Sequence, residues 1–281
     1  MIQDKDRHYN TLICGATFSG VGALLASPDN ALIVERTAMV GGEYIEAINP
    51  GQPGSLSLST HFGRNINEEL VARNLIEPAG GPLHLPALHP VLCRKLLDAQ
   101  ASILLLTEIV AVKPHERGYE VTICNAAGWQ VFTVSNILDT TSRRATCPGE
   151  RLESVARSLN AYILANDPEL ALPSLEHPSV ELVQGRFASE HILKWRIAPE
   201  EDWLAARDAL VRFWASRPAS LQPWTIAATA TELEYRVPVG ARQLGECWHW
   251  LPSAGYDHPL LAMEHGFVYR SLGVDNENGN L

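Results

Sequence analysis

The sequence has no long apolar run and no closely spaced pair of cysteines. Its 281 residues contain five cysteines, widely separated and odd in number, and none forms a C-x-x-C pair. Neither a zinc knuckle nor a vicinal redox disulfide is therefore expected. No apolar stretch reaches the roughly 18 residues that a membrane span needs, and residues 1–9 are too polar for a signal peptide. We therefore expect a cytoplasmic protein that does not cross a membrane.

Several functional signatures are also absent. No G-x-S-x-G motif occurs, and no lysine follows the glycine-rich turn as it does in a P-loop, so hydrolase and NTPase functions lack support. His84 and His89 are not accompanied by acidic or cysteine partners in a ligand pattern, and no metal site is predicted. The net charge of −10 argues against a general affinity for nucleic acid or for anionic membranes.

The composition is that of a globular protein. Hydrophobic residues make up 46% and charged residues 19% of the chain, which excludes an intrinsically disordered protein. The length is sufficient for one large domain or two modest ones with a sizeable core.

The first fifty residues follow the plan of a dinucleotide-binding strand–helix–strand unit. The apolar run Thr11–Cys14 predicts a strand buried on both faces. Gly15 allows a tight turn after it, and Gly20 allows the next helix to pack closely on the sheet. The N–H groups and the dipole at the start of that helix favour a pyrophosphate. A second strand, 31–34, ends at Glu35, where a carboxylate can reach a ribose hydroxyl pair.

One glycine of the G-x-G-x-x-G pattern is replaced, because Thr17 occupies the middle position. A glycine there lets the backbone approach the phosphates without an intervening side chain. Three explanations stay open: the Thr17 hydroxyl binds a phosphate oxygen, the coenzyme lies slightly displaced, or the turn belongs to an α/β protein that binds no nucleotide.

The rest of the chain predicts a second region of different architecture. A long loop is expected over residues 48–65. Helices are expected at 20–27, 66–76, 90–100, 198–214 and 258–272, and strands at 102–106, 109–113, 119–125, 130–134, 136–139, 159–164, 180–187, 190–197 and 224–234. We predict an α/β protein. Residues 1–150 and 236–281 are expected to form a Rossmann-like dinucleotide-binding domain with a parallel sheet and a small antiparallel insertion. Residues 151–235 form an antiparallel-sheet substrate domain with one helix.

Several short motifs resemble those of FAD-dependent oxidoreductases of the glutathione-reductase-like superfamily, the flavoproteins with two dinucleotide-binding motifs. The likeness covers most of the chain. It is carried by Gly15–Gly20, by Val34-Glu35-Arg36 followed by Gly41-Gly42, by Thr107–Val112, by Ile137–Ser142, and by Pro252–Gly255 before the last helix. The chain departs from the family where Ser142 replaces a glycine, where no G-D pair precedes the last helix, and where a separate NAD(P)H domain is absent.

The resemblance implies FAD as the cofactor and hydride transfer to or from flavin N5, with a small organic molecule as substrate. Electrons would come from that substrate, from a redox partner protein, or from NAD(P)H docked without its own domain. The motif positions imply a set of cofactor-binding residues: Gly15, Ala16, Thr17, Phe18, Ser19, Gly20, Glu35, Arg36, Gly41, Gly42, Ile109, Thr140, Thr141, Ser253, Ala254 and Gly255.

Four side chains are candidates for proton transfer near the flavin because of their positions along the chain: Tyr44, His61, Tyr256 and His258. Each also has an ordinary structural explanation, such as a surface histidine in a loop or a residue at a helix start. Glu43, beside Tyr44, can be an ordinary loop charge.

Two other functions stay open. The chain can be a flavin- or nucleotide-binding subunit without redox turnover of its own. It can also be an NAD-binding oxidoreductase that uses the same unit, in which case Glu35 favours NAD because a carboxylate repels a 2′-phosphate. A homodimer is compatible with either function.

Overall fold

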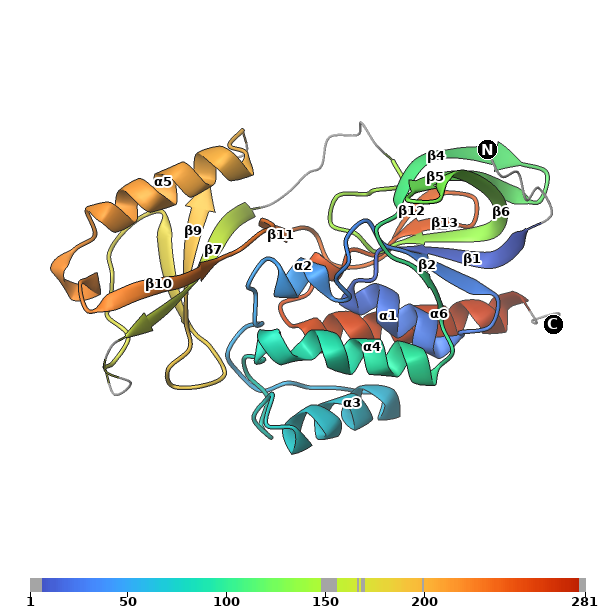
Figure 1. The fold of residues 1–281 in the computed structure, drawn as a ribbon. Coiled ribbons are helices and arrows are strands. Elements are labelled where there is room, and N and C mark those ends of the chain that lie inside the picture. The colour runs from blue at the N-terminus through green and yellow to red at the C-terminus, as the bar shows by residue number, and fades with distance from the viewer. Residues whose placement is uncertain (1–6, 148–155, 166, 168–169, 199, 278–281) are drawn as a thin grey trace.

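The computed structural model describes residues 7–147, 156–165, 167, 170–198 and 200–277. These residues form a mixed eight-stranded sheet and an antiparallel five-stranded sheet, which lie side by side (Figure 1). The predicted fold class is therefore confirmed. The boundary expected near residue 150 lies outside the described residues.

The larger sheet, sheet A, is built on parallel strands in the order β12-β13-β6-β1-β2-β3, with β12 antiparallel to β13. The long strand β6 pairs with β5 in an antiparallel hairpin and then continues beside β1, which is the predicted insertion. The strands of sheet A are β1 (His8–Cys14), β2 (Ala31–Val34), β3 (Ser102–Leu104), β4 (Glu108–His115), β5 (Gly118–Asn125), β6 (Gly128–Asp139), β12 (Arg242–Gly245) and β13 (Trp248–Trp250).

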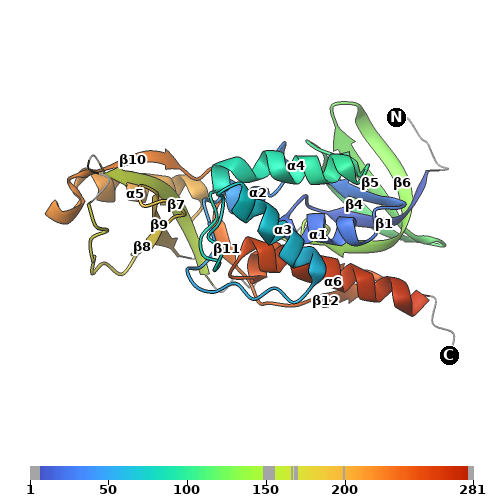
Figure 2. The same ribbon diagram turned by 90° about the horizontal axis from the view of Figure 1, so that it is seen from below.

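Both faces of β1 are buried, because different layers cover them. Leu12 and Cys14 pack into a core with the β4–β6 hairpins, whereas Ile13 faces the core shared with the helices. The views in Figures 1 and 2 show these helices together below sheet A. They are α1 (Phe18–Ala26), α2 (Gly42–Ile45), α3 (His61–Ala72), α4 (Leu88–Asp98) and α6 (Pro259–Glu277). None of the helices in the described ranges has the length and apolarity needed to cross a bilayer.

Helices α1 and α6 cross at two glycines. A Cβ on Gly22 would lie 1.9 Å from the Met263 carbonyl oxygen, and one on Gly266 would lie 2.0 Å from that of Ser19. The backbones touch because neither glycine carries a side chain. This crossing holds the end of the chain against the first helix.

The smaller sheet, sheet B, has the strand order β10-β7-β9-β8, and β11 also pairs with β7. Helix α5 lies along it at the far end of the molecule (Figure 1). The elements are β7 (Ala156–Ala165), β8 (Val180–Gln184), β9 (His191–Ile197), α5 (Trp203–Ala215), β10 (Trp224–Thr229) and β11 (Glu234–Arg236).

Three sequence predictions need correction. Helix α3 begins inside the expected loop, because Thr60 caps it and is itself bound by Glu264 of α6. The strand expected over 224–234 is two strands, since the chain turns away after β10 and the Thr231 N–H donates to the Glu46 carbonyl oxygen. Helix α5 begins at Trp203 after the capping residue Asp202. Pro199, expected in its first turn, lies outside the described residues.

Candidate functional site

The turn between β1 and α1 has the tight geometry that the glycines predict. Gly15 has φ +95°, a conformation that residues with a side chain rarely adopt. A Cβ on Gly20 would lie 2.2 Å from the Gly15 carbonyl oxygen. Helix α1 therefore begins directly at the carboxyl end of β1.

Thr17, the residue in place of the missing glycine, is the N-cap of α1. Its buried hydroxyl accepts from the Gly20 N–H at 3.1 Å and donates to the Thr140 hydroxyl at 2.8 Å. The Thr140 hydroxyl in turn reaches the Cys14 carbonyl oxygen at 2.9 Å. The Thr17 hydroxyl is engaged within the protein, so it is not the group that would meet a phosphate.

Glu35 turns back from the end of β2 toward the glycine turn. Its two carboxylate oxygens accept from the N–H of Ala16 at 2.9 Å and from the N–H of Thr37 at 2.7 Å. These bonds fix the carboxylate just beyond the carboxyl end of β2, where the sequence predicts a ribose contact.

The first N–H groups of α1 are only partly satisfied by the protein. The Ser19 N–H donates to the Ser253 hydroxyl at 3.3 Å, and the Gly20 N–H donates to Thr17. The described residues offer no acceptor to the N–H groups of Thr17 and Phe18. Two donors at the positive end of a helix suit an anion.

A cleft that is partly open to solvent extends from this turn toward sheet B. At one end it is lined by Thr107–Ile109, and at the other by Leu233–Tyr235. Several of the predicted residues line it: Gly15, Thr17, Glu35, Arg36, Gly42, Tyr44, Ile109, Thr141 and Ala254.

Other predicted cofactor-binding residues, all within the described ranges, do not line this cleft: Ala16, Phe18, Ser19, Gly20, Gly41, Thr140, Ser253 and Gly255. They support its wall instead. The Ser253 N–H donates to the Thr140 carbonyl oxygen at 3.0 Å, and the Gly41 N–H donates to the Ala16 carbonyl oxygen at 2.7 Å. These bonds join β6, α2 and residues 252–256, here called the closing segment, to the glycine turn.

Glu43, which sequence reasoning treated as an ordinary loop charge, faces the cleft. Its Oε1 accepts from both the N–H and the hydroxyl of Ser142, whereas its buried Oε2 has no hydrogen-bond partner among the described residues. Burial raises the pKa of Glu43 to about 7, and the carboxyl groups of Glu35 and Asp139 act in the same direction. The two bonds from Ser142 oppose this shift without reversing it.

The two predicted tyrosines hold the closing segment. The Tyr44 hydroxyl lies 2.9 Å from the Ser253 carbonyl oxygen and 2.7 Å from that of Tyr256. The Tyr256 ring stacks on His265 with ring centroids 4.5 Å apart. Burial raises the pKa of both phenols above 10, so both stay protonated near neutral pH.

The two predicted histidines do not line the cleft, although the structure describes both. His61 is exposed at the start of α3, with its Nε2 3.2 Å from the Asn65 amide nitrogen. His258 is buried: its Nδ1 accepts from the Leu260 N–H at 3.1 Å, which leaves its Nε2–H to donate to the Gly81 carbonyl oxygen at 3.0 Å. Burial lowers the pKa of His258 to about 4, so the ring is neutral.

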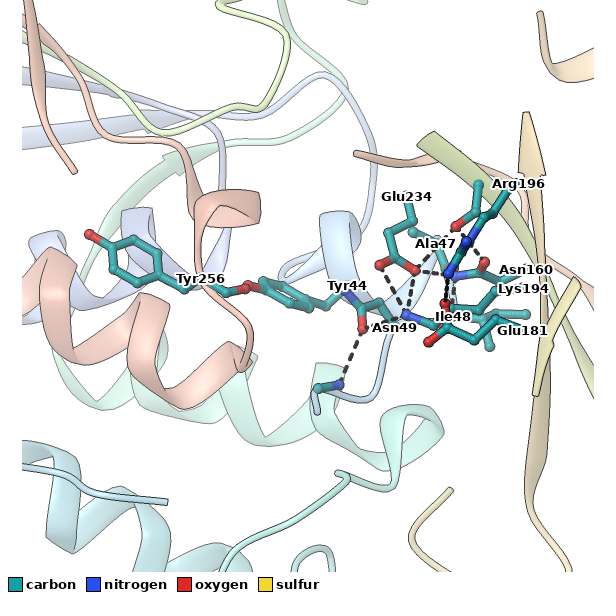
Figure 3. Close-up of polar contacts among 12 residues, drawn as sticks. Tyr44, Ala47, Ile48, Asn49, Asn160, Glu181, Lys194, Arg196, Glu234 and Tyr256 are labelled. Carbon is teal, nitrogen blue, oxygen red and sulfur yellow. Dashed lines mark hydrogen bonds and ion pairs between the residues drawn. The ribbon is translucent and has the colours of Figure 1, made fainter. Parts of the chain in front are cut away.

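A polar cluster from sheet B surrounds Glu234, which lines the other end of the cleft (Figure 3). The Lys194 Nζ lies 2.8 and 3.0 Å from the two carboxylate oxygens of Glu234, and the Asn160 amide donates to Glu234 at 2.6 Å. All three side chains are buried. The Asn160 amide also donates to the Ala47 carbonyl oxygen, and Lys194 reaches Asn49 at 3.5 Å. Sequence reasoning missed this cluster, because its members come from separate strands with no motif.

No protein-family model and no curated protein matches the sequence. Solved structures match at low identity. An aklavinone-11 hydroxylase, solved with FAD and aklavinone, has a TM-score of 0.59 and 14% identity over 98% of this chain and 64% of its own. A glycine oxidase from Bacillus cereus has a TM-score of 0.59 and 12% identity over 97% of this chain and 96% of its own.

A third similar structure is the myxobacterial chondrochloren halogenase, a FAD-dependent halogenase. It has a TM-score of 0.63 and 14% identity over 96% of this chain and 76% of its own. This chain therefore has the fold of these enzymes.

The residues of the cleft are compatible with FAD on one condition. The turn at Gly15 is tight, Thr17 is turned into the protein, and two helix N–H groups lack acceptors. Glu43 does not fit as a carboxylate, because its Oε2 has no hydrogen-bond partner among the described residues and its negative charge would repel a diphosphate. The fit therefore requires Glu43 in its neutral form.

Proposed function

We propose that this chain is a FAD-dependent oxidoreductase that acts on a small organic substrate. The observation that carries the proposal is a continuous cleft that starts at Thr107–Ile109, passes the glycine turn and reaches sheet B. The fold supports it, since one similar enzyme is solved with FAD and another is a FAD-dependent halogenase. When bound, the flavin supplies hydride transfer at N5.

Different residues along the cleft would contact the ribose, the diphosphate and the substrate. Glu35 would hold the ribose, and the N–H groups of Thr17 and Phe18 would hold the diphosphate. Residues 1–150 and 236–281 would form this coenzyme half, and 151–235 the substrate half.

At the sheet B end, Glu234, which lines the cleft and is held by Lys194, would orient a polar group of the substrate. Of the four predicted proton-transfer residues, Tyr44 is at the cleft but engaged by backbone carbonyls. We therefore assign it the positioning of the closing segment.

The test is to purify the chain, reconstitute it with FAD, remove free coenzyme and identify what stays bound by mass and by its visible spectrum. Bound FAD that is bleached by a reductant and reoxidised in air supports the proposal. A colourless chain that retains no FAD contradicts it, and retention of NAD alone favours an NAD-dependent oxidoreductase that uses the same turn.

A further inference from the structure

Glu43 is held in a way that separates the roles of its two oxygens. Oε1 accepts two hydrogen bonds from Ser142, whereas Oε2 is buried without a partner among the described residues. A carboxylate would leave half of its charge on that unpartnered oxygen, which is costly. A carboxylic acid keeps Oε1 as the acceptor and turns Oε2 into a donor.

The groups around Glu43 also favour the acid. Glu35 faces it from β2 and Asp139 from β6, and both are acidic. Two arginines line the same cleft, but the Arg143 guanidinium donates to the Tyr235 hydroxyl at 3.0 and 3.2 Å, and Arg36 pairs with Glu232. Cys14 at the end of β1 is a buried thiol whose pKa is raised by burial, so it adds no charge.

We propose that Glu43 binds the coenzyme diphosphate as the neutral acid, donating its Oε2–H to a phosphate oxygen, so that binding at alkaline pH takes up one proton from solvent. This rests on the proposed function. Glu43 lines the cleft together with Gly15 and with Thr17, the N-cap residue of α1. The raised pKa of Glu43, about 7, places the change of protonation within an accessible range.

The experiment is calorimetric titration of the full chain with FAD in two buffers of different ionisation enthalpy, between about pH 6 and about pH 9. The difference between buffers gives the protons taken up per FAD. We expect almost none at the acid end and nearly one at the alkaline end. Above about pH 7, the apparent Kd should rise toward tenfold per pH unit.

Two variants sharpen the result. Glu43→Gln keeps an acceptor for Ser142 and a permanent donor for the phosphate, so its Kd should be independent of pH and no proton should be taken up. Glu108→Gln removes a charge from the exposed rim of the same cleft and should keep the pH dependence of the unaltered chain.

The outcomes separate the two proposals. FAD binding without net proton uptake by the unaltered chain overturns the role of Glu43 and leaves the proposed function standing. Proton uptake that persists in Glu43→Gln also overturns that role. If neither the unaltered chain nor Glu43→Gln binds FAD at any pH tested, the proposed function fails and this inference with it.

Discussion

The two ends of the cleft treat a buried carboxyl group in different ways. At the sheet B end, Glu234 is paired with Lys194 at 2.8 Å and also accepts from Asn160. At the glycine-turn end, Glu43 has only the N–H and hydroxyl of Ser142, and one of its oxygens has no partner among the described residues. Lys194 pairs with the first group, whereas burial raises the pKa of the second to about 7.

The two ends of the cleft therefore respond differently to the charge of a bound group. A buried pair with good geometry is already compensated, so it can orient a polar ligand without changing its own charge. A lone buried carboxyl group changes charge with pH and with the charge of what binds beside it. The first two predictions alter the surroundings of one of these buried carboxyl groups. The third alters an exposed ion pair of the same cleft, which serves as the reference.

The largest expected effect is that of Lys194→Met, which leaves Glu234 buried without its cation. Loss of one partner of a buried pair costs about 3–5 kcal/mol in the free energy of unfolding. Urea denaturation at neutral pH measures it. The double variant Lys194→Met with Glu234→Gln should recover most of the loss, because no uncompensated charge remains; a double variant as unstable as the single one would show that Lys194 acts through packing.

A smaller effect, of opposite sign, is expected from Glu43→Gln in the chain without coenzyme. The folded pKa of Glu43, about 7, lies above the unfolded value of 4.5. The folded chain therefore holds more protons between these values, and the stability contributed by Glu43 is complete below about pH 4.5 and lost as pH rises to about 7. At about pH 8, Glu43→Gln should be more stable than the unaltered chain by on the order of 3 kcal/mol.

Thermal unfolding of both proteins from about pH 5 to about pH 8 measures this difference. The gap between the two curves should widen only over the stated window. A gap that stays constant with pH would mean that Glu43 does not titrate there.

The smallest effect is expected from Arg36→Ala. Arg36 and Glu232 form an ion pair of 2.8 Å across the mouth of the cleft, but the arginine side chain is 53% exposed. Exposed pairs contribute about 0–1 kcal/mol and are screened by salt. Urea denaturation in low and high salt measures the effect, with Arg94→Ala as a matched control from the exposed pair of Arg94 and Asp98 on α4. A loss as large as that of Lys194→Met would make Arg36 a structural element of the cleft.

The sequence predicted the central strands of sheet A and its first helix well because their signals are local. An apolar run, Gly15, Gly20 and the acidic Glu35 occur within one strand–helix–strand unit, and each acts on its immediate neighbours. The alternating strands of the 107–134 insertion were also found, since alternation is visible in the chain itself. The start of α3 was missed, because Thr60 is bound by Glu264 from the other end of the chain.

The site was only partly predictable for the same reason. The sequence singled out Thr17 as a departure from the glycine pattern, but only the fold shows that Thr140 receives its hydroxyl. The sequence gives no sign that Lys194 and Glu234 form a pair, since 40 residues separate them.

The amino-acid order by itself determined that β1 leads through a tight turn directly into α1, because Gly15 adopts a positive φ and Gly20 packs against the turn only without a side chain. Only the tertiary structure decided which carboxyl groups near the cleft carry charge. Protonation depends on burial and on partners from distant strands: Glu234 pairs with Lys194 across sheet B, whereas Oε2 of Glu43 has no hydrogen-bond partner among the described residues.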